Sequence, residues 1–289
     1  MKLRHCRAPR DEGDPEPGAY PQPTPRLLYV HDDLSDEVER RLGAASPAAA
    51  LTRALFEFLG DGERVVILTV AQQVECVIAQ GPHAPFDLTL CIGRAGDRVA
   101  EALHAKTGWF PRLRRLGLTR EEDGNGGYRL VSTEPATLAA QLERVESSES
   151  LAVVDDTIFS GLTLRSVLEA LPPALLRRTH AFCLRGVAES VGPIARLCPV
   201  TVGVAAPGRI LEDVSFINAS GLVLRVGIRR RGQPPLAFFE RPDWIRAWFP
   251  GRDREVIAAC QRLNALLEPG RLSGDFTAGG GEGSLRGPH

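Results

Sequence analysis

The stretch 151–164, LAVVDDTIFSGLTL, limits most strongly what this chain can fold into. Four apolar residues suited to a buried strand come first, and the adjacent carboxylates Asp155 and Asp156 end that run. A turn of small and hydroxylated residues follows, and an amphipathic helix over about 162–171 then begins. Backbone N–H groups at a helix N-terminus can bind a phosphate. Two carboxylates can accept hydrogen bonds from sugar hydroxyls or hold a divalent metal. The stretch therefore predicts a polyol-phosphate site.

Strand-like and helix-like segments alternate around this stretch. The expected strands are 64–70, 86–93, 128–132, 151–156, 179–187 and 199–206, with a short one within 109–117. The expected helices are 46–59, 97–108, 135–147, 162–171 and 189–198, whereas 71–80 could be a helix or a strand and a Gly- and Asn-rich loop starts at 119. This alternation predicts an α/β fold with a doubly wound, mostly parallel sheet. Ligands of such sheets bind at the carboxyl ends of the strands.

Composition divides the chain into five parts. Residues 1–25 are rich in proline and charge and 268–289 in glycine and serine, so both are expected to be disordered. Between them we expect an N-terminal helical extension (26–60) and a core (61–206). A smaller subdomain (207–267) follows, with a strand over 222–226 and a basic cluster at Arg229–Arg231.

Charge and cysteine content exclude several classes of function. The formal net charge is −1, so no overall field recruits nucleic acid or an anionic membrane. The six cysteines form no C-x-x-C pair, and we expect them to be buried thiols in a reducing cytosol. With no apolar span of transmembrane length, the expected location is the cytoplasm and no membrane partner is expected.

Two motifs in the expected order carry a resemblance to a known family. VVDDTIFSGLT (153–163) resembles the phosphoribosyl-pyrophosphate (PRPP) signature of type I phosphoribosyltransferases, and CIGRAGDRVAEAL (91–103) is similar to the pyrophosphate loop and helix of that family. The flexible GNGG segment (124–127) lies between them, as the mobile loop does in the family. The resemblance covers about 60–206 and implies a type I phosphoribosyltransferase-like fold, with 207–267 as a C-terminal hood over the acceptor.

The resemblance also implies roles for individual residues. Asp155 and Asp156 would be the catalytic pair, holding the ribose hydroxyls, stabilising positive charge at C1′ and lying in the ribose and Mg²⁺ region as direct or indirect metal ligands. The residues expected at the 5′-phosphate are Thr157, Ile158, Phe159, Ser160, Gly161, Leu162 and Thr163. The residues expected at pyrophosphate are Gly93, Arg94, Ala95 and Gly96. Mg²⁺ is the expected cofactor.

Structural explanations compete with each of these roles. The acid pair could cap a turn, Ser160 or Thr163 could cap a helix, and the GRAG segment could be a plain strand–helix turn. In the hood, Trp244 and Trp248 lie at i, i+4, which suits either a core or a stacking platform for an acceptor. Asp213 is a further candidate at the acceptor. Arginines on both sides of the flexible segment could close over the leaving group or remain solvated; they are Arg112, Arg114, Arg115, Arg120 and Arg129.

Two residues depart from the family pattern. Phe159 stands where members often have Thr or an acid that serves the base, and Leu162 stands where a smaller residue is usual. Phe159 leaves the acceptor open between a nucleobase and a hydroxyl or amine of a specialised metabolite.

The sequence predicts Mg²⁺-dependent transfer of 5-phosphoribosyl from PRPP to that small-molecule acceptor, with release of pyrophosphate. The alternative is a regulator that senses PRPP or a nucleotide without turnover, and a third hypothesis is phosphoribosyl hydrolysis or phosphorolysis. A homodimer is the family-based expectation for assembly.

Overall fold

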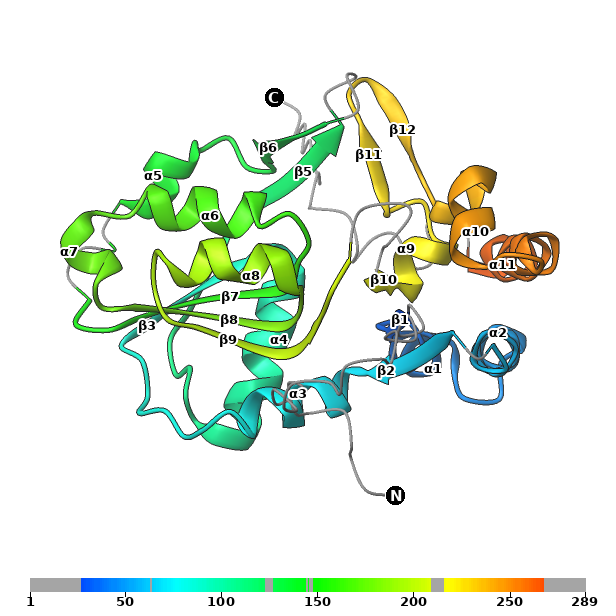
Figure 1. The fold of residues 1–289 in the computed structure, drawn as a ribbon, viewed down its shortest axis with the longest axis horizontal. Helices are drawn as coiled ribbons and strands as arrows, with labels where there is room; N and C mark the ends of the chain where they lie inside the picture. The colour runs from blue at the N-terminus through cyan, green and yellow to red at the C-terminus, as the bar shows by residue number, and fades with distance from the viewer. Residues whose placement is uncertain are drawn as a thin grey trace, which may run out of the picture.

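A parallel sheet forms the centre of one lobe of the protein (Figure 1). The computed structural model describes residues 27–62, 64–122, 127–143, 145, 148–208 and 216–267. The sheet has the strand order β4-β3-β7-β8-β9, and every neighbouring pair is parallel. Its strands are β3 (Leu88–Ile92), β4 (Leu113–Leu116), β7 (Leu151–Ile158), β8 (Thr179–Val187) and β9 (Val200–Ala206).

Helices cover both faces of this sheet because its central strands are apolar on both sides. In β7, Leu151 and Val153 pack into one cluster and Ala152 and Val154 into another. The first face is covered by α5 (Leu138–Leu142), α6 (Leu162–Glu169), α7 (Pro173–Leu176) and α8 (Ala188–Ala195), and the second by α3 (Val70–Ile78) and α4 (Gly93–Thr107) (Figure 1). The α/β class with a doubly wound, mostly parallel sheet is thus confirmed.

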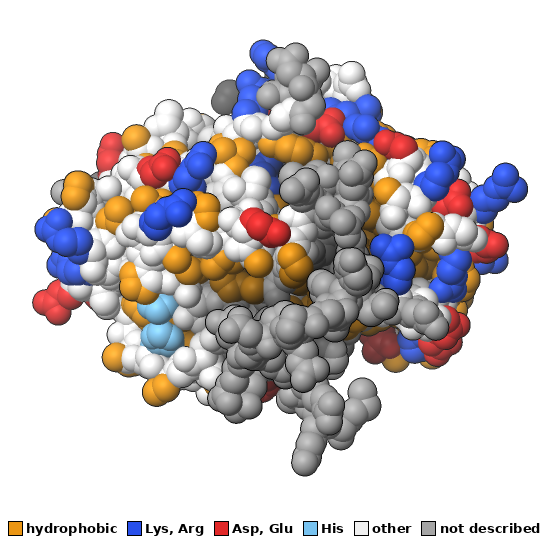
Figure 2. Space-filling view, viewed as in Figure 1, with side chains coloured by type: hydrophobic (Ala, Val, Ile, Leu, Met, Phe, Trp, Pro, Cys, Tyr) orange, Lys and Arg blue, Asp and Glu red, His pale blue; other side chains and the backbone are white. Residues whose placement is uncertain are grey.

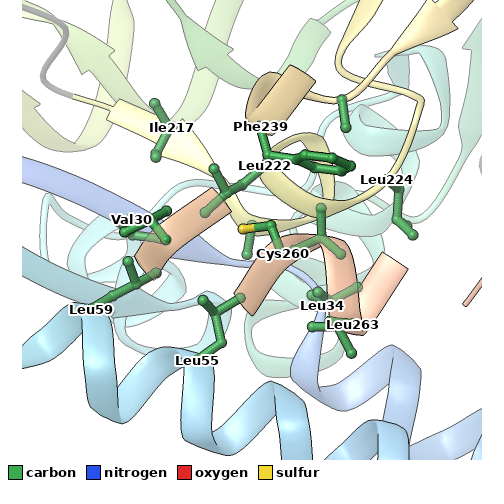
Figure 3. Packing of buried hydrophobic residues seen from close by; sticks show 14 of the residues in the cluster. Val30, Leu34, Leu55, Leu59, Ile217, Leu222, Leu224, Phe239, Cys260 and Leu263 are labelled. Atoms are coloured by element: carbon green, nitrogen blue, oxygen red, sulfur yellow. The ribbon is translucent and has the colours of Figure 1, made fainter. Parts of the chain in front are cut away.

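A second lobe is built from both ends of the described chain. Its parallel sheet has the order β10-β1-β2. The strands are β1 (Leu28–Asp32), β2 (Val65–Thr69) and β10 (Phe216–Asn218). The helices are α1 (Ser35–Leu42), α2 (Pro47–Gly60), α9 (Ala219–Val223), η1 (Phe238–Glu240), α10 (Pro242–Trp248) and α11 (Asp253–Leu267). Figure 3 shows Val30, Leu55, Ile217 and Cys260 from these distant segments packed in one cluster.

A third sheet, with the order β12-β11-β5-β6, joins the two lobes at one edge (Figure 1). Its strands are β5 (Leu118–Glu122), β6 (Tyr128–Ser132), β11 (Ile228–Arg230) and β12 (Gln233–Leu236). The bridge between the lobes is the parallel pairing of Glu122 with Arg230, and Arg241 donates to both carboxylate oxygens of Glu122 at 3.3 Å. The hairpin β5–β6 is therefore attached to the second lobe as well as to the core.

Several local expectations change. The segment 71–80 is a helix because Thr69 and Gln72 form a capping box at its start. Within 222–226, Leu222 and Val223 belong to a helix, since burial in the second lobe overrides β-propensity. The loop expected from 119 begins instead with β5, and the helix expected over 135–147 is limited to α5. The helix expected from 97 starts at Gly93.

The terminal segments expected to be disordered, and most of the flexible GNGG segment, lie outside the described residues. Within the described ranges, no helix combines the length and the apolar character needed to cross a membrane. On the face that Figure 2 shows, basic and acidic side chains are interspersed rather than gathered into a patch of one sign. Cys91, Cys183, Cys198 and Cys260 are buried free thiols, as expected, whereas Cys76 is disulfide-bonded, so the expectation of a free thiol is wrong there.

Glycine at position 203 lets α3 approach the sheet. A Cβ there would lie 2.8 Å from the carbonyl oxygens of Gln73 and Leu184. We expect Gly203→Ala to lower the free energy of unfolding by about 1–3 kcal/mol, because backbone atoms cannot move aside as a flexible side chain can. Urea unfolding of the parent and the variant measures this loss. The matched control is Gly192→Ala in α8, where a Cβ meets nothing within 4 Å and a stability equal to or above the parent is expected. Equal losses in both variants would contradict the close approach.

Candidate active site

A cavity of about 670 Å³ opens at the carboxyl ends of β3 and β7, with residues of the second lobe on its other side. The strand order reverses between these two strands, which makes this the switch point where doubly wound sheets bind ligands. Every residue expected at the ribose, 5′-phosphate or pyrophosphate lines the cavity except Ser160 and Gly96. The fold thus brings the two separate motifs to one place.

The two adjacent carboxylates differ sharply in their surroundings. Asp156 accepts a hydrogen bond at 2.9 Å from Nη2 of Arg185, a β8 residue that is only 1% exposed. Its Oδ2 atom also accepts from Thr157 Oγ1 at 3.0 Å. Asp155 Oδ1 accepts the backbone N–H of Asp156 at 2.8 Å, and the carboxyl has no cation as a hydrogen-bond partner among the described residues. Because a buried guanidinium requires a counter-charge, Asp156 is held as a carboxylate.

These surroundings move the two pKa values in opposite directions. Burial, and then the neighbouring charge of Asp156, raises the pKa of Asp155 well above its usual value. Burial is the largest single influence on Asp156 and acts to raise its pKa, but the Arg185 guanidinium, His31 and the hydrogen bond from Thr157 together lower it below its usual value. Two adjacent carboxyls, of which only Asp156 pairs with the buried Arg185, favour a single negative charge on the pair.

A hydrogen-bonded chain leads from this ion pair to the second lobe. Arg185 Nη1 donates to Gln73 Oε1 at 3.3 Å, and Gln73 Nε2 lies 2.6 Å from His31 Nδ1. Gln73 is completely buried and His31 is 4% exposed at the end of β1. Burial, together with the Arg185 charge, lowers the pKa of His31 well below its usual value, so the imidazole is neutral.

Strand β1 ends in acids that also reach the cavity. Asp32 caps α1 by accepting the backbone N–H of Ser35 at 2.8 Å. Asp33 accepts the backbone N–H of Ser220 at 2.8 Å and the hydroxyl of the same residue. Burial raises the pKa of Asp33. These contacts join β1 to α9, and both acids line the cavity.

Two helices begin at the cavity, one on each motif. Gly161 precedes α6 with a φ of 74°, and Ser160 Oγ accepts from Leu162 N–H at 3.4 Å. At the other helix, Gly93 has a φ of 58° and GRAG forms the first turn of α4. Gly96 is required there because a Cβ would lie 2.5 Å from the Val154 carbonyl oxygen. Two helix N-termini therefore offer backbone N–H groups to one cavity.

Of the arginines that flank the flexible segment, two line the cavity, Arg115 and Arg120. Arg120 lies 5.4 Å from the centroid of the Phe159 ring, and its charge acts on Asp155. Arg115 pairs with Asp97. The other three bond elsewhere: Arg112 to Asp87, Arg114 to the backbone carbonyls of Gln141 and Glu143, and Arg129 to Glu121.

The hood residues that the sequence suggested for the acceptor lie elsewhere. Trp244 and Trp248 are 5.7 Å apart between ring centroids and pack with Phe238 in the second lobe. Neither tryptophan lines the cavity. Asp213 lies outside the described residues.

The sequence reading missed His31, Asp33, Gln73 and Arg185. A signal for the first two was present: LYVHDDLSDEVERRL (28–42) is a strand that ends in acids before a helix, the pattern of 151–169. No comparable local signal marked the other two.

The donor set at the cavity suits a hard cation. Among the described residues, no group of three His, Cys, Asp or Glu side chains is arranged to hold a metal ion. Asp155 and Asp156 offer only carboxylate oxygens, which Mg²⁺ prefers, and this ion usually takes its remaining ligands from water and substrate phosphates. The residues therefore fit Mg²⁺ held largely by a phosphorylated ligand.

The asymmetry of the acid pair predicts opposite effects on stability at pH 7. We expect Asp156→Asn to lower the free energy of unfolding by roughly 3 kcal/mol because Arg185 loses its counter-charge; the value is at the low end for buried pairs since the Asp156 side chain is 31% exposed. Asp155→Asn is expected to match or exceed the parent. Urea unfolding of the two variants checks this, and equal losses would contradict it.

The direction of the Asp155 pKa shift also predicts how the stability difference between Asp155→Asn and the parent changes with pH. The folded-state pKa of Asp155 is raised. The contribution of this carboxyl to the free energy of unfolding is therefore fully present below the ordinary carboxyl pKa and is lost as the pH rises through the raised value. The advantage of Asp155→Asn should therefore grow with pH above about 4. An advantage that shrinks over that range would show that Asp155 is not the disfavoured charge.

Scans against protein-family models and curated protein sequences gave no match. Solved structures share features of the fold. A Neisseria gonorrhoeae hypothetical protein with bound ppGpp is 17% identical, with a TM-score of 0.35 over 52% of this chain and 80% of that one. A Pyrococcus horikoshii purine phosphoribosyltransferase is 14% identical, with a TM-score of 0.31 over 67% and 92%. Helicobacter pylori xanthine-guanine-hypoxanthine phosphoribosyltransferase is 12% identical, with a TM-score of 0.33 over 66% and 92%. Similarity this low decides nothing about the chemistry of the site.

Proposed function

We propose that this protein transfers the 5-phosphoribosyl group of PRPP to a small-molecule acceptor and releases pyrophosphate, in a reaction that depends on Mg²⁺. The observation that carries the proposal is that three groups share one cavity. The N-terminus of α6, the acid pair and the N-terminus of α4 all line it. A ligand with two phosphate-bearing ends and a diol suits that set of groups.

The residues around the cavity would bind different parts of PRPP, according to their chemistry. Backbone N–H groups at 161–163 would bind the 5′-phosphate, and those of the GRAG turn would bind pyrophosphate, with Arg94 adding charge. Asp155 and Asp156 would hold the ribose hydroxyls and face the positive charge that grows at C1′ as the C1′–O bond breaks. Bound Mg²⁺ would neutralise charge on the pyrophosphate leaving group.

Arg120 would support the departure of pyrophosphate. It belongs to β5, next to the segment 123–126, lines the cavity, contacts the Phe159 ring, and its charge acts on Asp155. A cation there is free to turn toward an anion, since its contact with Phe159 is one of the weaker interactions for a guanidinium.

Binding of PRPP or a nucleotide without transfer is the second candidate. One observation favours it: position 159 holds a phenylalanine whose ring packs with apolar residues near β9 and against Arg120. That side chain cannot exchange a proton with an acceptor. Release of pyrophosphate, rather than binding, separates the two candidates.

Isothermal titration and pyrophosphate release test the proposal. We expect Mg²⁺–PRPP to bind the parent saturably. Asp155→Asn should reduce acceptor-dependent pyrophosphate release by about 100-fold or more, because bound Mg²⁺ would favour the ionised form of Asp155 and an amide cannot supply that charge near C1′. Asp87→Asn is the matched control, since Asp87 pairs with Arg112 and does not line the cavity. Its activity should equal that of the parent.

Two results count against the proposal. Absence of Mg²⁺–PRPP binding would overturn the transfer proposal and leave the second candidate only as a nucleotide-binding role. Saturable binding with no pyrophosphate release against nucleobases, amines and hydroxyl compounds would leave the binding role alone.

A further inference from the structure

Among the residues of the second lobe that line the cavity is a histidine whose tautomer can be worked out from its neighbours. His31 lies at the carboxyl end of β1, lines the cavity and is almost fully buried. Its Nδ1 atom faces Gln73. Among the described residues, no hydrogen bond reaches its Nε2 atom, which is also absent from the buried atoms that lack a partner. Nε2 is thus the ring nitrogen that is open to a ligand.

The orientation of the Gln73 amide is fixed by what surrounds it. Its oxygen accepts from Arg185 Nη1, which can only donate. Its nitrogen lies 3.0 Å from the Thr69 carbonyl oxygen and 3.3 Å from that of Leu68. A flipped amide would place oxygen against two carbonyl oxygens and an NH₂ group against a guanidinium. The NH₂ group therefore faces His31.

This orientation decides which nitrogen of His31 carries the proton. At 2.6 Å, the Gln73 Nε2 and His31 Nδ1 atoms must share a hydrogen. Since Gln73 supplies it, Nδ1 accepts, and the single proton of the neutral ring is on Nε2. The rival arrangement has the proton on Nδ1 instead, with the Leu68 carbonyl as another neighbour of the ring. It would press two N–H groups together across 2.6 Å.

Given the proposed function, we infer that His31 donates an Nε2–H hydrogen bond to the acceptor, and that Gln73 and Arg185 are positioning residues that fix this tautomer. The acceptor must then present a lone pair of oxygen or nitrogen at this point. A protonated amine cannot do so, because all its polar hydrogens are donors. The chemical class is a neutral or anionic molecule with an oxygen or ring-nitrogen acceptor atom.

The location fits a residue that acts on specificity rather than on PRPP. His31 comes from the second lobe, whereas the acid pair and both helix N-termini belong to the core. The Arg185 guanidinium contacts both Asp156 and Gln73, so one buried cation orders the ribose side and the acceptor side together. A molecule that presents no lone pair at this point would leave the buried Nε2–H group of His31 without a hydrogen bond, which costs binding free energy.

Nuclear magnetic resonance tests the tautomer without any substrate. In protein labelled with ¹⁵N-histidine, two-bond ¹⁵N–¹H correlations should show His31 protonated at Nε2 and bare at Nδ1 at pH 7.5; loss of the signals in His31→Gln assigns them. Gln73→Glu replaces the NH₂ donor by an acceptor and should move the proton to Nδ1. Gln73→Leu, a second variant that removes both groups, should give a mixture. A proton on Nδ1 in the parent would overturn the inference.

Kinetics test the contact with the acceptor. The probes are uracil, hypoxanthine and nicotinate, which carry suitable oxygens, and ethanolamine, which is cationic at neutral pH. With an oxygen-bearing probe that the parent uses, His31→Leu should raise the acceptor KM roughly tenfold. His31→Gln, which keeps an N–H donor near the Nε2 position, should recover most of that loss. The dissociation constant of Mg²⁺–PRPP should stay unchanged in both variants.

The outcomes separate this inference from the proposed function. Equal KM values for parent and His31→Leu, turnover of ethanolamine alone, or Mg²⁺–PRPP binding without turnover of any oxygen-bearing probe would each overturn the acceptor contact. In those cases Mg²⁺–PRPP binding would still support the function. Loss of Mg²⁺–PRPP binding in the parent would instead overturn the function, while the tautomer measurement would stand.

Discussion

The ion pair between Arg185 and Asp156 is the interaction on which the rest of the site depends. A guanidinium buried to 1% exposure is tolerated only with a carboxylate and further hydrogen-bond partners. Those partners come from β7, from α3 through Gln73 and, one step further, from β1 through His31. A single buried charge therefore sets the relative placement of the core sheet, one of its covering helices and the second lobe.

The cavity owes its character to the meeting of two parallel sheets. In each sheet, a strand that ends in paired acids faces the cavity: β7 with Asp155 and Asp156, and β1 with Asp32 and Asp33. The acids of β1 are satisfied by a helix cap and by Ser220, so their contacts hold the lobe together. The Asp155 carboxyl bonds only to its neighbour Asp156 among the described residues and has no paired cation, so we expect the capacity to bind a ligand to be greatest there.

The parts of the fold that could be predicted are those set by neighbours in the chain. The apolar run 151–154 predicted a strand buried on both faces. The start of the helix expected over 46–59 and the end of the one expected over 97–108 agree with the structure, where Ser46 is the N-cap of α2 and Gly108 the C-cap of α4. The partners of His31 could not be predicted, since Gln73 lies 42 positions away and Arg185 a further 112 beyond it. The helix at 219–223 likewise forms because the second lobe buries it, which no local pattern shows.

The split origin of the second lobe has a consequence for how the chain folds. Val30 pairs with Ile217, and Asp33 bonds to Ser220 across 187 positions. A loop that long is costly to close before the segment inside it is ordered. During synthesis, β1 must wait for the whole core to emerge before it acquires β10, α9 and α11 as partners. The core is thus expected to be the first unit to form, with completion of the cavity as the last event of folding.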